Sequence, residues 1–124
     1  MAYTEMPREL SGQDAGVMLL SQGISEHGCS PTKVGEYWAV GLPVVTTPNV
    51  SDTDEIVRSE RVGVVIEGPA PHCYERALEE LLALSRDPDL ANRCRRAAER
   101  HYNLRLAIER QLELYAAVLG RPCP

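Results

Sequence analysis

The chain has 124 residues, which suffices for one domain with a modest core and is too short for two domains of full size. Its apolar share of 44% and charged share of 25% are those of an ordinary globular protein, and a net charge of −5 argues against nucleic acid as the main partner. No segment is long and apolar enough to span a bilayer, and residues 1–10 lack a signal-peptide core, so we expect a cytoplasmic protein without a transmembrane segment.

The first part of the chain predicts a strand followed by a helix. Residues 1–12 are expected to form a lead-in of one or two helical turns, and the short apolar run 16–20 predicts a strand. After a polar loop over 21–29, Ser30 and Pro31 indicate a helix start, because serine is a favoured N-cap and proline fits the first helical position.

Gly41 is expected to end this helix, and the apolar run 42–45 predicts a buried second strand. A strand, a helix and a strand in this order form a βαβ unit, whose strands are parallel. The expected fold is therefore α/β, with a partial Rossmann-like parallel sheet of about three strands and several C-terminal helices. Thr46 and Thr47 follow the second strand, where turn hydrogen bonding and ligand contact are both open roles.

The first helix points to an anion site. Ligands of open parallel sheets bind in the crevice at the carboxyl ends of the strands, and the loop 21–29 and the start of this helix face that crevice. The free amides of Thr32 and Lys33, together with the positive end of the helix dipole, favour a negative charge there. A phosphate is the expected ligand.

Glu36 follows Lys33 by three residues, so the two side chains share one face of the helix. A carboxylate one turn beyond a phosphate site is suited to accept hydrogen bonds from the two hydroxyls of a ribose. The structural alternative is a solvated surface pair between Glu36 and Lys33.

The later part of the chain predicts a short helix, a third strand and a helical region. Ser51 is a suitable N-cap for the short helix, and the run 63–66 predicts the strand. Residues 72–119 are expected to be helical, with a new helix starting at Asp87-Pro88 and a last helix over 104–119.

Apolar residues recur at helical spacing in two of these helices. One predicted stripe consists of Tyr74, Ala77, Leu78, Leu81 and Leu82. The last helix has an apolar side that should cover a core, pair with a second copy or stay exposed, formed by Ile108, Leu112, Tyr115 and Leu119.

The sequence contains four scattered cysteines without a CxxC pair, Cys29, Cys73, Cys94 and Cys123. They are expected to be reduced thiols, some of them buried as small apolar residues. Cys29 precedes a helix start, which lowers the pKa of a thiol, so a reactive thiol is an alternative role for it. The three histidines form no cluster at metal-ligand spacing, and no metal is predicted.

The run from Ser30 to Val45, in the order Ser-Pro-Thr-Lys-x-x-Glu-Tyr-x-Ala-x-Gly-Leu-Pro-Val-Val, resembles the donor-site signature of group 1 glycosyltransferases, family 4 of the retaining GT-B enzymes. The segments Asp14-Ala15-Gly16, Asp54-Glu55-Ile56-Val57 and Val62-Gly63-Val64-Val65-Ile66 match the same order of elements. The resemblance implies that residues 1–124 are a single α/β domain, the second half of the donor-binding C-terminal domain. Three preceding strands and the acceptor-binding N-terminal domain would then be missing.

The resemblance also assigns roles to the helix start. Glu36 would be the second glutamate of the family's motif of two glutamates and would bind the ribose of a nucleotide sugar. Thr32 and Lys33 would offer main-chain amides to the diphosphate, within a donor-binding segment that includes Ser30 and Pro31.

One position departs from the family pattern. Where the family has its first glutamate, which contacts the transferred sugar, this chain has Gly28. The nearest carboxylate, Glu26, is the candidate for that catalytic role.

The implied function is the nucleotide-sugar-binding part of a retaining glycosyltransferase, which moves a sugar from a nucleotide diphosphate sugar to an acceptor without a cofactor. The family's arginine and lysine on the diphosphate lie earlier in the C-terminal domain and are missing here, so the isolated chain is expected to be inactive. Two alternatives remain open. One is a non-catalytic binding or assembly module that forms a homodimer through an exposed sheet edge or the terminal helix, and the other is a flavodoxin-like or other phosphate-binding domain.

Overall fold

Three short apolar runs form one parallel sheet in the computed structural model, which describes residues 3–21 and 23–120. The strands are β1 (Gly16–Met18), β2 (Val44–Thr46) and β3 (Gly63–Val65), in the spatial order β1-β2-β3. Their register sets Val17 opposite Val45 and Val45 opposite Val64. The predicted α/β class and parallel three-stranded sheet are therefore confirmed.

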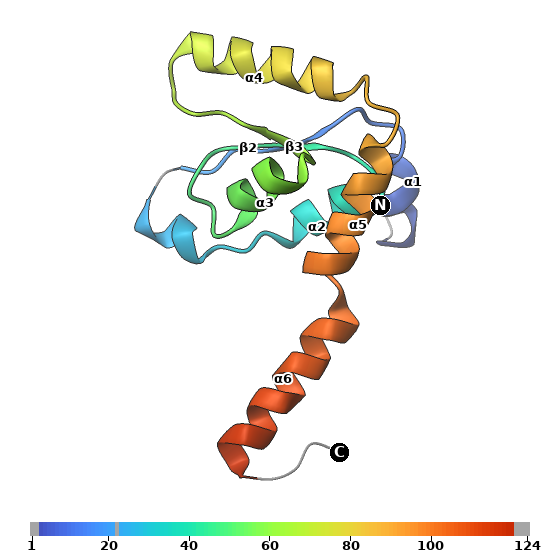
Figure 1. The fold of residues 1–124 in the computed structure, drawn as a ribbon, viewed down its shortest axis with the longest axis vertical. Coiled ribbons are helices and arrows are strands. Elements are labelled where there is room, and N and C mark those ends of the chain that lie inside the picture. The colour runs from blue at the N-terminus through green and yellow to red at the C-terminus, as the bar shows by residue number, and fades with distance from the viewer. Residues whose placement is uncertain (1–2, 22, 121–124) are drawn as a thin grey trace.

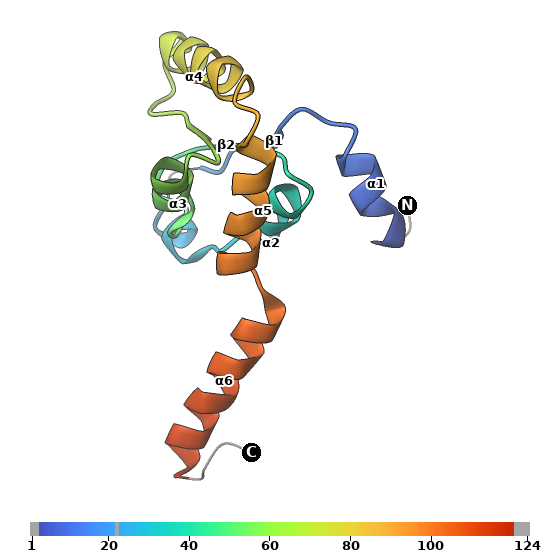
Figure 2. The ribbon, with the colours of Figure 1, turned by 45° about the vertical axis from the view of Figure 1, so that its right-hand side comes forward.

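Helices cover both faces of this sheet. They are α1 (Met6–Leu10), α2 (Thr32–Ala39), α3 (Thr53–Glu60), α4 (Pro71–Leu84), α5 (Leu90–His101) and α6 (Leu104–Leu119), with 3-10 turns η1 (Tyr3–Glu5) and η2 (Ile24–Gly28). Figure 1 shows α4 on one face of the sheet and α2, α3 and α5 on the other. In Figure 2, α1 stands apart from this body and α6 extends away from it. None of the helices in the described ranges is both long and apolar enough to cross a membrane.

The larger part of the core lies between the sheet and α2, α3 and α5. Trp38 is fully buried there, and its indole Nε1 donates a hydrogen bond of 3.1 Å to the carbonyl of Val62. The same carbonyl accepts a 3.1 Å bond from the amide of Val44, so both of its lone pairs are used. This one acceptor links α2 and β2 to the residue that precedes β3. The cluster around it contains Val34, Ile56, Val57, Val65, Leu84, Leu90, Cys94, Ala97 and Ala98.

A smaller core lies between the sheet and α4. Val64, Ile66 and Ala77 are buried there, and Val45, Cys73 and Leu81 pack against them. The predicted stripe of α4 is therefore only partly right, because Tyr74, Leu78 and Leu82 are 45%, 56% and 55% exposed. The small Ala77 allows α4 to approach the sheet closely, and the helix turns these three larger side chains away from it.

Three predicted helix starts are wrong by one to three residues. α2 begins at Thr32 rather than Pro31, and Pro31 is the extended cap residue with ψ 113°. Ser51 does not cap α3, because its φ of 50° places it in the preceding turn and Asp52 is the cap. α5 starts at Leu90, since Asp87 instead accepts a hydrogen bond from the amide of Asp89 within the turn.

The physical reason at α2 is the proline itself. Pro31 itself has extended backbone and occupies the cap position, so Ser30 lies one residue too far from α2 to cap it, and proline has no side-chain acceptor of its own. The helix therefore starts without any side-chain cap. Its end agrees with the prediction, because Gly41 follows α2 with a φ of 91° that favours glycine.

The last helix matches its predicted range, and the structure excludes one of the three outcomes left open for its apolar side, namely that it covers the core of this chain. α6 has no buried residue, and Ile108, Leu112, Tyr115 and Leu119 are 49%, 44%, 53% and 67% exposed. Its start is well capped, since the side chain of Asn103 accepts hydrogen bonds from the amides of Arg105 and Leu106. The apolar side is thus exposed in this chain.

We expect Gly63→Ala to destabilise the fold by about 1–3 kcal/mol, because a Cβ at Gly63 would overlap the backbone of Val44 and force β2 and β3 apart. The matched control is Gly28→Ala, where a Cβ meets no atom within 4 Å and the expected change is within about 0.5 kcal/mol. Urea unfolding measures both values, and equal stability of the two variants would contradict this account of the strand contact.

Candidate functional site

The start of α2 is an open set of backbone donors. Pro31 makes no side-chain cap, and the amide of Val34 is bonded to the carbonyl of Pro31 at 3.1 Å. Within the described residues, the amides of Thr32 and Lys33 meet no acceptor, and both residues are exposed. Unpaired amides at the positive end of a helix attract an anion.

Glu36 lies one turn further along α2 and is partly buried. Among the described residues its carboxylate forms no hydrogen bond or ion pair, so the surface pair with Lys33 does not occur in this structure. A partly buried carboxylate without a partner is free to accept hydrogen bonds from a ligand.

Thr32 and Glu36 line the same hollow of about 450 Å³ between α2 and the end of α5. Its other lining residues are Gly35, Ala39, Ala98, Glu99, Tyr102 and Asn103. Lys33 is not among the lining residues. The fold thus brings two of the predicted donor-site residues together on one surface.

Ser30 lines a neighbouring hollow of about 260 Å³ with Asp52, Ile56, Arg100, His101, Tyr102 and Arg110. Both Arg100 and His101 contact the Glu60 carboxylate, at 2.8 Å and 2.6 Å. Burial raises the pKa of Glu60, but the His101 hydrogen bond and the Arg100 charge outweigh it, and the pKa lies below its usual range. Ser30 is therefore close to the predicted site but faces a different, mixed-charge environment.

Glu26 is held within its own loop. Its carboxylate accepts hydrogen bonds of 2.7 Å from the hydroxyls of Ser21 and Ser25, and these hydroxyls lower its pKa. It does not line either hollow beside α2. The structure therefore does not bring Glu26 and Glu36 onto one surface.

Thr47 takes the turn role that was left open for it. Its hydroxyl accepts a bond from the amide of Leu20 at 3.2 Å and donates one to the carbonyl of Leu20 at 3.0 Å. Thr46 is fully buried. These bonds tie the end of β1 to the end of β2, and thereby hold the start of the loop that leads to α2.

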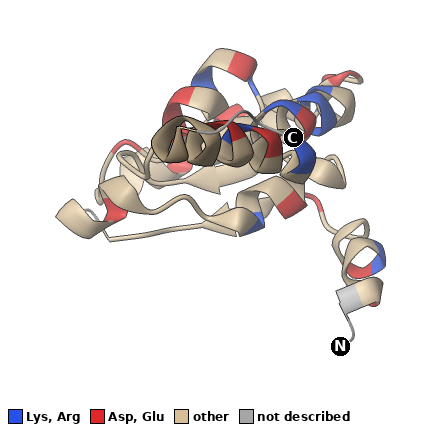
Figure 3. Cartoon of the chain, turned by 90° about the horizontal axis from the view of Figure 1, so that it is seen from below, with Lys and Arg blue, Asp and Glu red and all other residues tan. Residues whose placement is uncertain are grey.

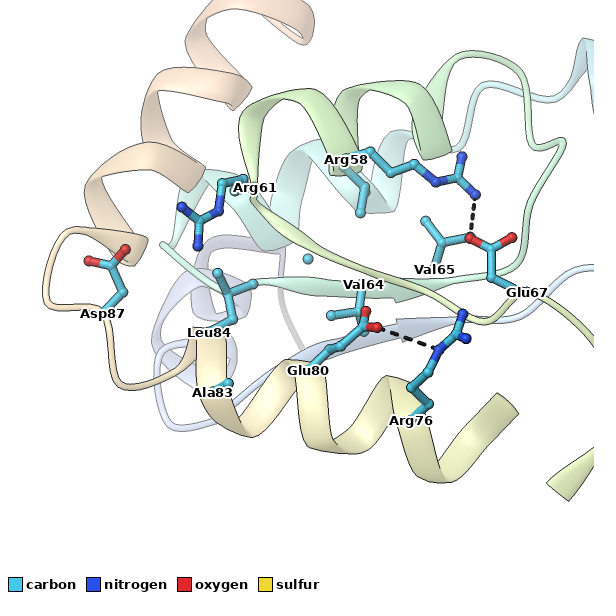
Figure 4. A pocket seen from close by; sticks show the side chains of 12 residues that line it. Arg58, Arg61, Val64, Val65, Glu67, Arg76, Glu80, Ala83, Leu84 and Asp87 are labelled. Atoms are coloured by element: carbon cyan, nitrogen blue, oxygen red, sulfur yellow. Dashed lines mark hydrogen bonds and ion pairs between the residues drawn. The ribbon is translucent and has the colours of Figure 1, made fainter. Parts of the chain in front are cut away.

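A further hollow, of about 440 Å³, lies at the outer edge of β3 between α3 and α4 (Figure 4). Two of its three arginines are engaged with acids, Arg58 with Glu67 at 2.8 Å and Arg76 with Glu80 at 3.6 Å, and the third is Arg61. It contains none of the predicted site residues. This hollow is therefore not part of the predicted donor site.

Charge does not mark a nucleic-acid surface on the face seen in Figure 3, where acidic and basic segments are interspersed along the helices. Within the described residues, no three His, Cys, Asp or Glu side chains gather closely enough to hold a metal ion. The chemistry of the candidate site consequently rests on backbone amides and one carboxylate.

Sequence reasoning missed Tyr102. This residue follows α5 and lines both hollows beside α2. Its ring lies edge-on to Trp38, with centroids 5.8 Å apart and an interplanar angle of 72°. The only sequence signal was an aromatic residue at the end of a charged helix. That signal gives no information about the contact of Tyr102 with Gly35, 67 positions earlier.

The parallel sheet and the βαβ connection define a partial Rossmann-like α/β domain. A family model of the glycosyl transferases group 1 matches residues 2–101. The chain therefore belongs to the group 1 glycosyltransferase family, as the motif around Glu36 predicted. No curated protein and no solved structure matches the chain significantly.

The cysteines of the described ranges differ sharply in environment. Cys29 is exposed, Cys73 is partly buried and Cys94 is fully buried, while Cys123 lies outside the described residues. Burial raises the pKa of Cys94 to about 11, although the charges of Arg93 and Arg95 oppose the rise. One thiol is thus a core residue, as predicted for part of the set.

We expect iodoacetamide at neutral pH to modify Cys29 rapidly and to leave Cys94 unmodified in the folded protein, because a buried thiol with a raised pKa is neither accessible nor ionised. Peptide mass spectrometry after timed quenching measures the two rates. Denaturant should equalise them, and equal rates in the folded protein would show that α5 is packed differently.

Proposed function

We propose that this chain is the nucleotide-sugar-binding part of a retaining GT-B glycosyltransferase. Membership of the group 1 family supports glycosyl transfer in general. The observation that carries the finer proposal is the pairing of an uncapped helix start with an unpartnered carboxylate one turn later, at Thr32 and Glu36, on one hollow.

In the proposed complex, the diphosphate lies at the start of α2. The amides of Thr32 and Lys33 donate to its oxygens, and the Glu36 carboxylate accepts from the ribose hydroxyls. Ser30 and Pro31 complete the turn in front of the helix.

The protein-side chemistry is electrostatic. As the bond between the sugar and the diphosphate breaks, negative charge develops on the leaving phosphate, and fixed amides and the helix dipole stabilise it without reorganising. No metal or cofactor is required by this step. The acceptor would be held by a separate N-terminal domain, as the GT-B architecture implies.

The first test is nucleotide binding. Titration calorimetry with UDP and GDP should detect one of the two as a ligand, and Glu36→Ala should weaken its binding about 10–100-fold, because charged hydrogen bonds to the ribose are lost. Glu79→Ala is the matched control, since Glu79 is an exposed acid on α4, on the other face of the sheet. Unchanged affinity in Glu36→Ala would contradict the proposed ribose contact.

We expect no sugar transfer or donor hydrolysis by residues 1–124 alone with UDP- or GDP-sugars, because in a GT-B enzyme the acceptor and the cationic diphosphate contacts would come from parts of the protein outside these residues. Product analysis by mass spectrometry over a long incubation measures this. Turnover by the isolated chain, abolished in Glu36→Ala, would overturn the expectation of inactivity.

The competing function is a non-catalytic assembly module. The exposed apolar side of α6 favours it, since Tyr115 and Leu119 are more than half exposed. Sedimentation equilibrium measures the oligomeric state, and the calorimetric titration measures nucleotide binding. A firm dimer that binds no nucleotide supports the module, and a chain that binds nucleotide supports the donor site.

A further inference from the structure

Tyr102 stands at the junction between the last two helices. Its amide donates a 2.8 Å hydrogen bond to the carbonyl of Ala98 and so closes α5, and the next residue, Asn103, caps α6. Because both neighbouring helices fix its backbone, the direction of its side chain is set by α5 and α6 rather than by a flexible loop.

The ring of Tyr102 packs directly on α2. A Cβ built at Gly35 would overlap the ring, so the glycine is what allows this approach. The ring also meets Trp38 edge-on, one turn further along α2. Tyr102 therefore presses on the helix at two points, and both lie within a turn of Glu36.

Tyr102 also faces the residues in front of α2 and α3, because it lines one hollow together with Ser30 and Asp52. Burial raises the pKa of Tyr102, while the neighbouring hydroxyls of Thr53 and Ser30 oppose the rise. The group is consequently neutral at ordinary pH and available as a hydrogen-bond donor. Ser30 belongs to the turn that delivers Pro31 and the open amides of α2.

Tyr102 also separates the two hollows beside α2. It lines the one that contains Thr32 and Glu36 and the one that contains Ser30 and Arg110. A side chain shared by both walls fixes how the turn before α2 sits relative to the helix. No other residue lines both hollows.

We infer that Tyr102 is a positioning residue for the anion site: its ring holds α2 through Gly35 and Trp38, and the same side chain forms the wall between this site and the hollow at Ser30. This inference rests on the proposed nucleotide function for its ligand. The junction between α5 and α6 thus positions the donor site through Tyr102. The orientation of the terminal helix α6 is thereby coupled to nucleotide affinity.

The test compares Tyr102→Phe, which keeps the ring, with Tyr102→Leu, which removes the ring and the hydroxyl. Nucleoside diphosphate affinity is measured by calorimetry at a temperature at which all variants are folded by far-UV circular dichroism. We expect affinity within about twofold of the wild type for Tyr102→Phe, which keeps the ring on Gly35 and Trp38, and at least tenfold weaker binding for Tyr102→Leu, which removes it. The matched controls are Tyr74→Phe and Tyr74→Leu on α4, with unchanged affinity.

A second measurement does not need a ligand. Trp38 is the single tryptophan of the chain, so near-UV circular dichroism reports the ring contact, and hydrogen exchange reports the opening of α2. Tyr102→Leu should change the tryptophan signal and accelerate exchange in residues 30–38 while β2 and α4 keep wild-type exchange. If Tyr102 served only global stability, its replacement would accelerate hydrogen exchange throughout the chain and leave the nucleotide affinity of the folded protein unchanged.

The outcomes separate the two proposals. If the wild type binds nucleotide, Glu36→Ala weakens binding and Tyr102→Leu binds as the wild type does, the positioning role is overturned and the donor site stands. If the wild type binds no nucleotide, the proposed function fails, and faster exchange confined to residues 30–38 still supports the positioning role. Exchange that is unchanged or raised throughout the chain overturns it.

Discussion

The structure depends on the burial of Trp38 against the start of β3. The indole is fully buried, and its N–H donates to the same Val62 carbonyl that accepts from the amide of Val44. Burying an indole removes a large apolar area from water, and an unpaired N–H in that position would cost free energy comparable to a lost hydrogen bond. Because the acceptor belongs to the sheet, α2 has one rotational setting in which both conditions are met. Every side chain of α2 is oriented by that setting.

The rotation of α2 determines what the helix offers to solvent. With Val34 and Trp38 directed into the core, Thr32 and Glu36 lie on the hollow shared with the end of α5. The proline before the helix removes the ordinary cap and leaves the first amides open. Pro31 therefore has two effects: it shifts the start of α2 by one residue from the prediction, and it leaves the first amides of α2 free to donate to an anion.

Two parts of the chain contribute little to the core of this fold. No residue of α1 or α6 is buried, and both helices stand apart from the sheet. By contrast, α5 is anchored to the rest of the fold by contacts from within the helix and from the residue that follows it. Arg93 donates to the carbonyl of Arg61 after α3, and the chain after α5 packs on Gly35 through Tyr102. The boundary between packed and exposed structure thus falls at Tyr102, next to the proposed site.

The sequence by itself determined the α/β class, the parallel order of the strands, the end of α2 at Gly41 and the family, because each depends on local spacing or on a continuous motif from Ser30 to Val45. Helix starts were less accessible, since the conformation at Pro31 and Ser51 is set by turns that propensity does not encode. Only the tertiary structure decided that Glu36 is unpaired, that Glu26 is bound by its own serines and that Tyr102 packs on Gly35. The packing of α2 against α5 fixes the Tyr102–Gly35 contact and the surroundings of Glu36, and no local pattern carries that information. The Glu26 bonds are local, but they depend on the conformation of the turn Ile24–Gly28, which propensity alone does not set.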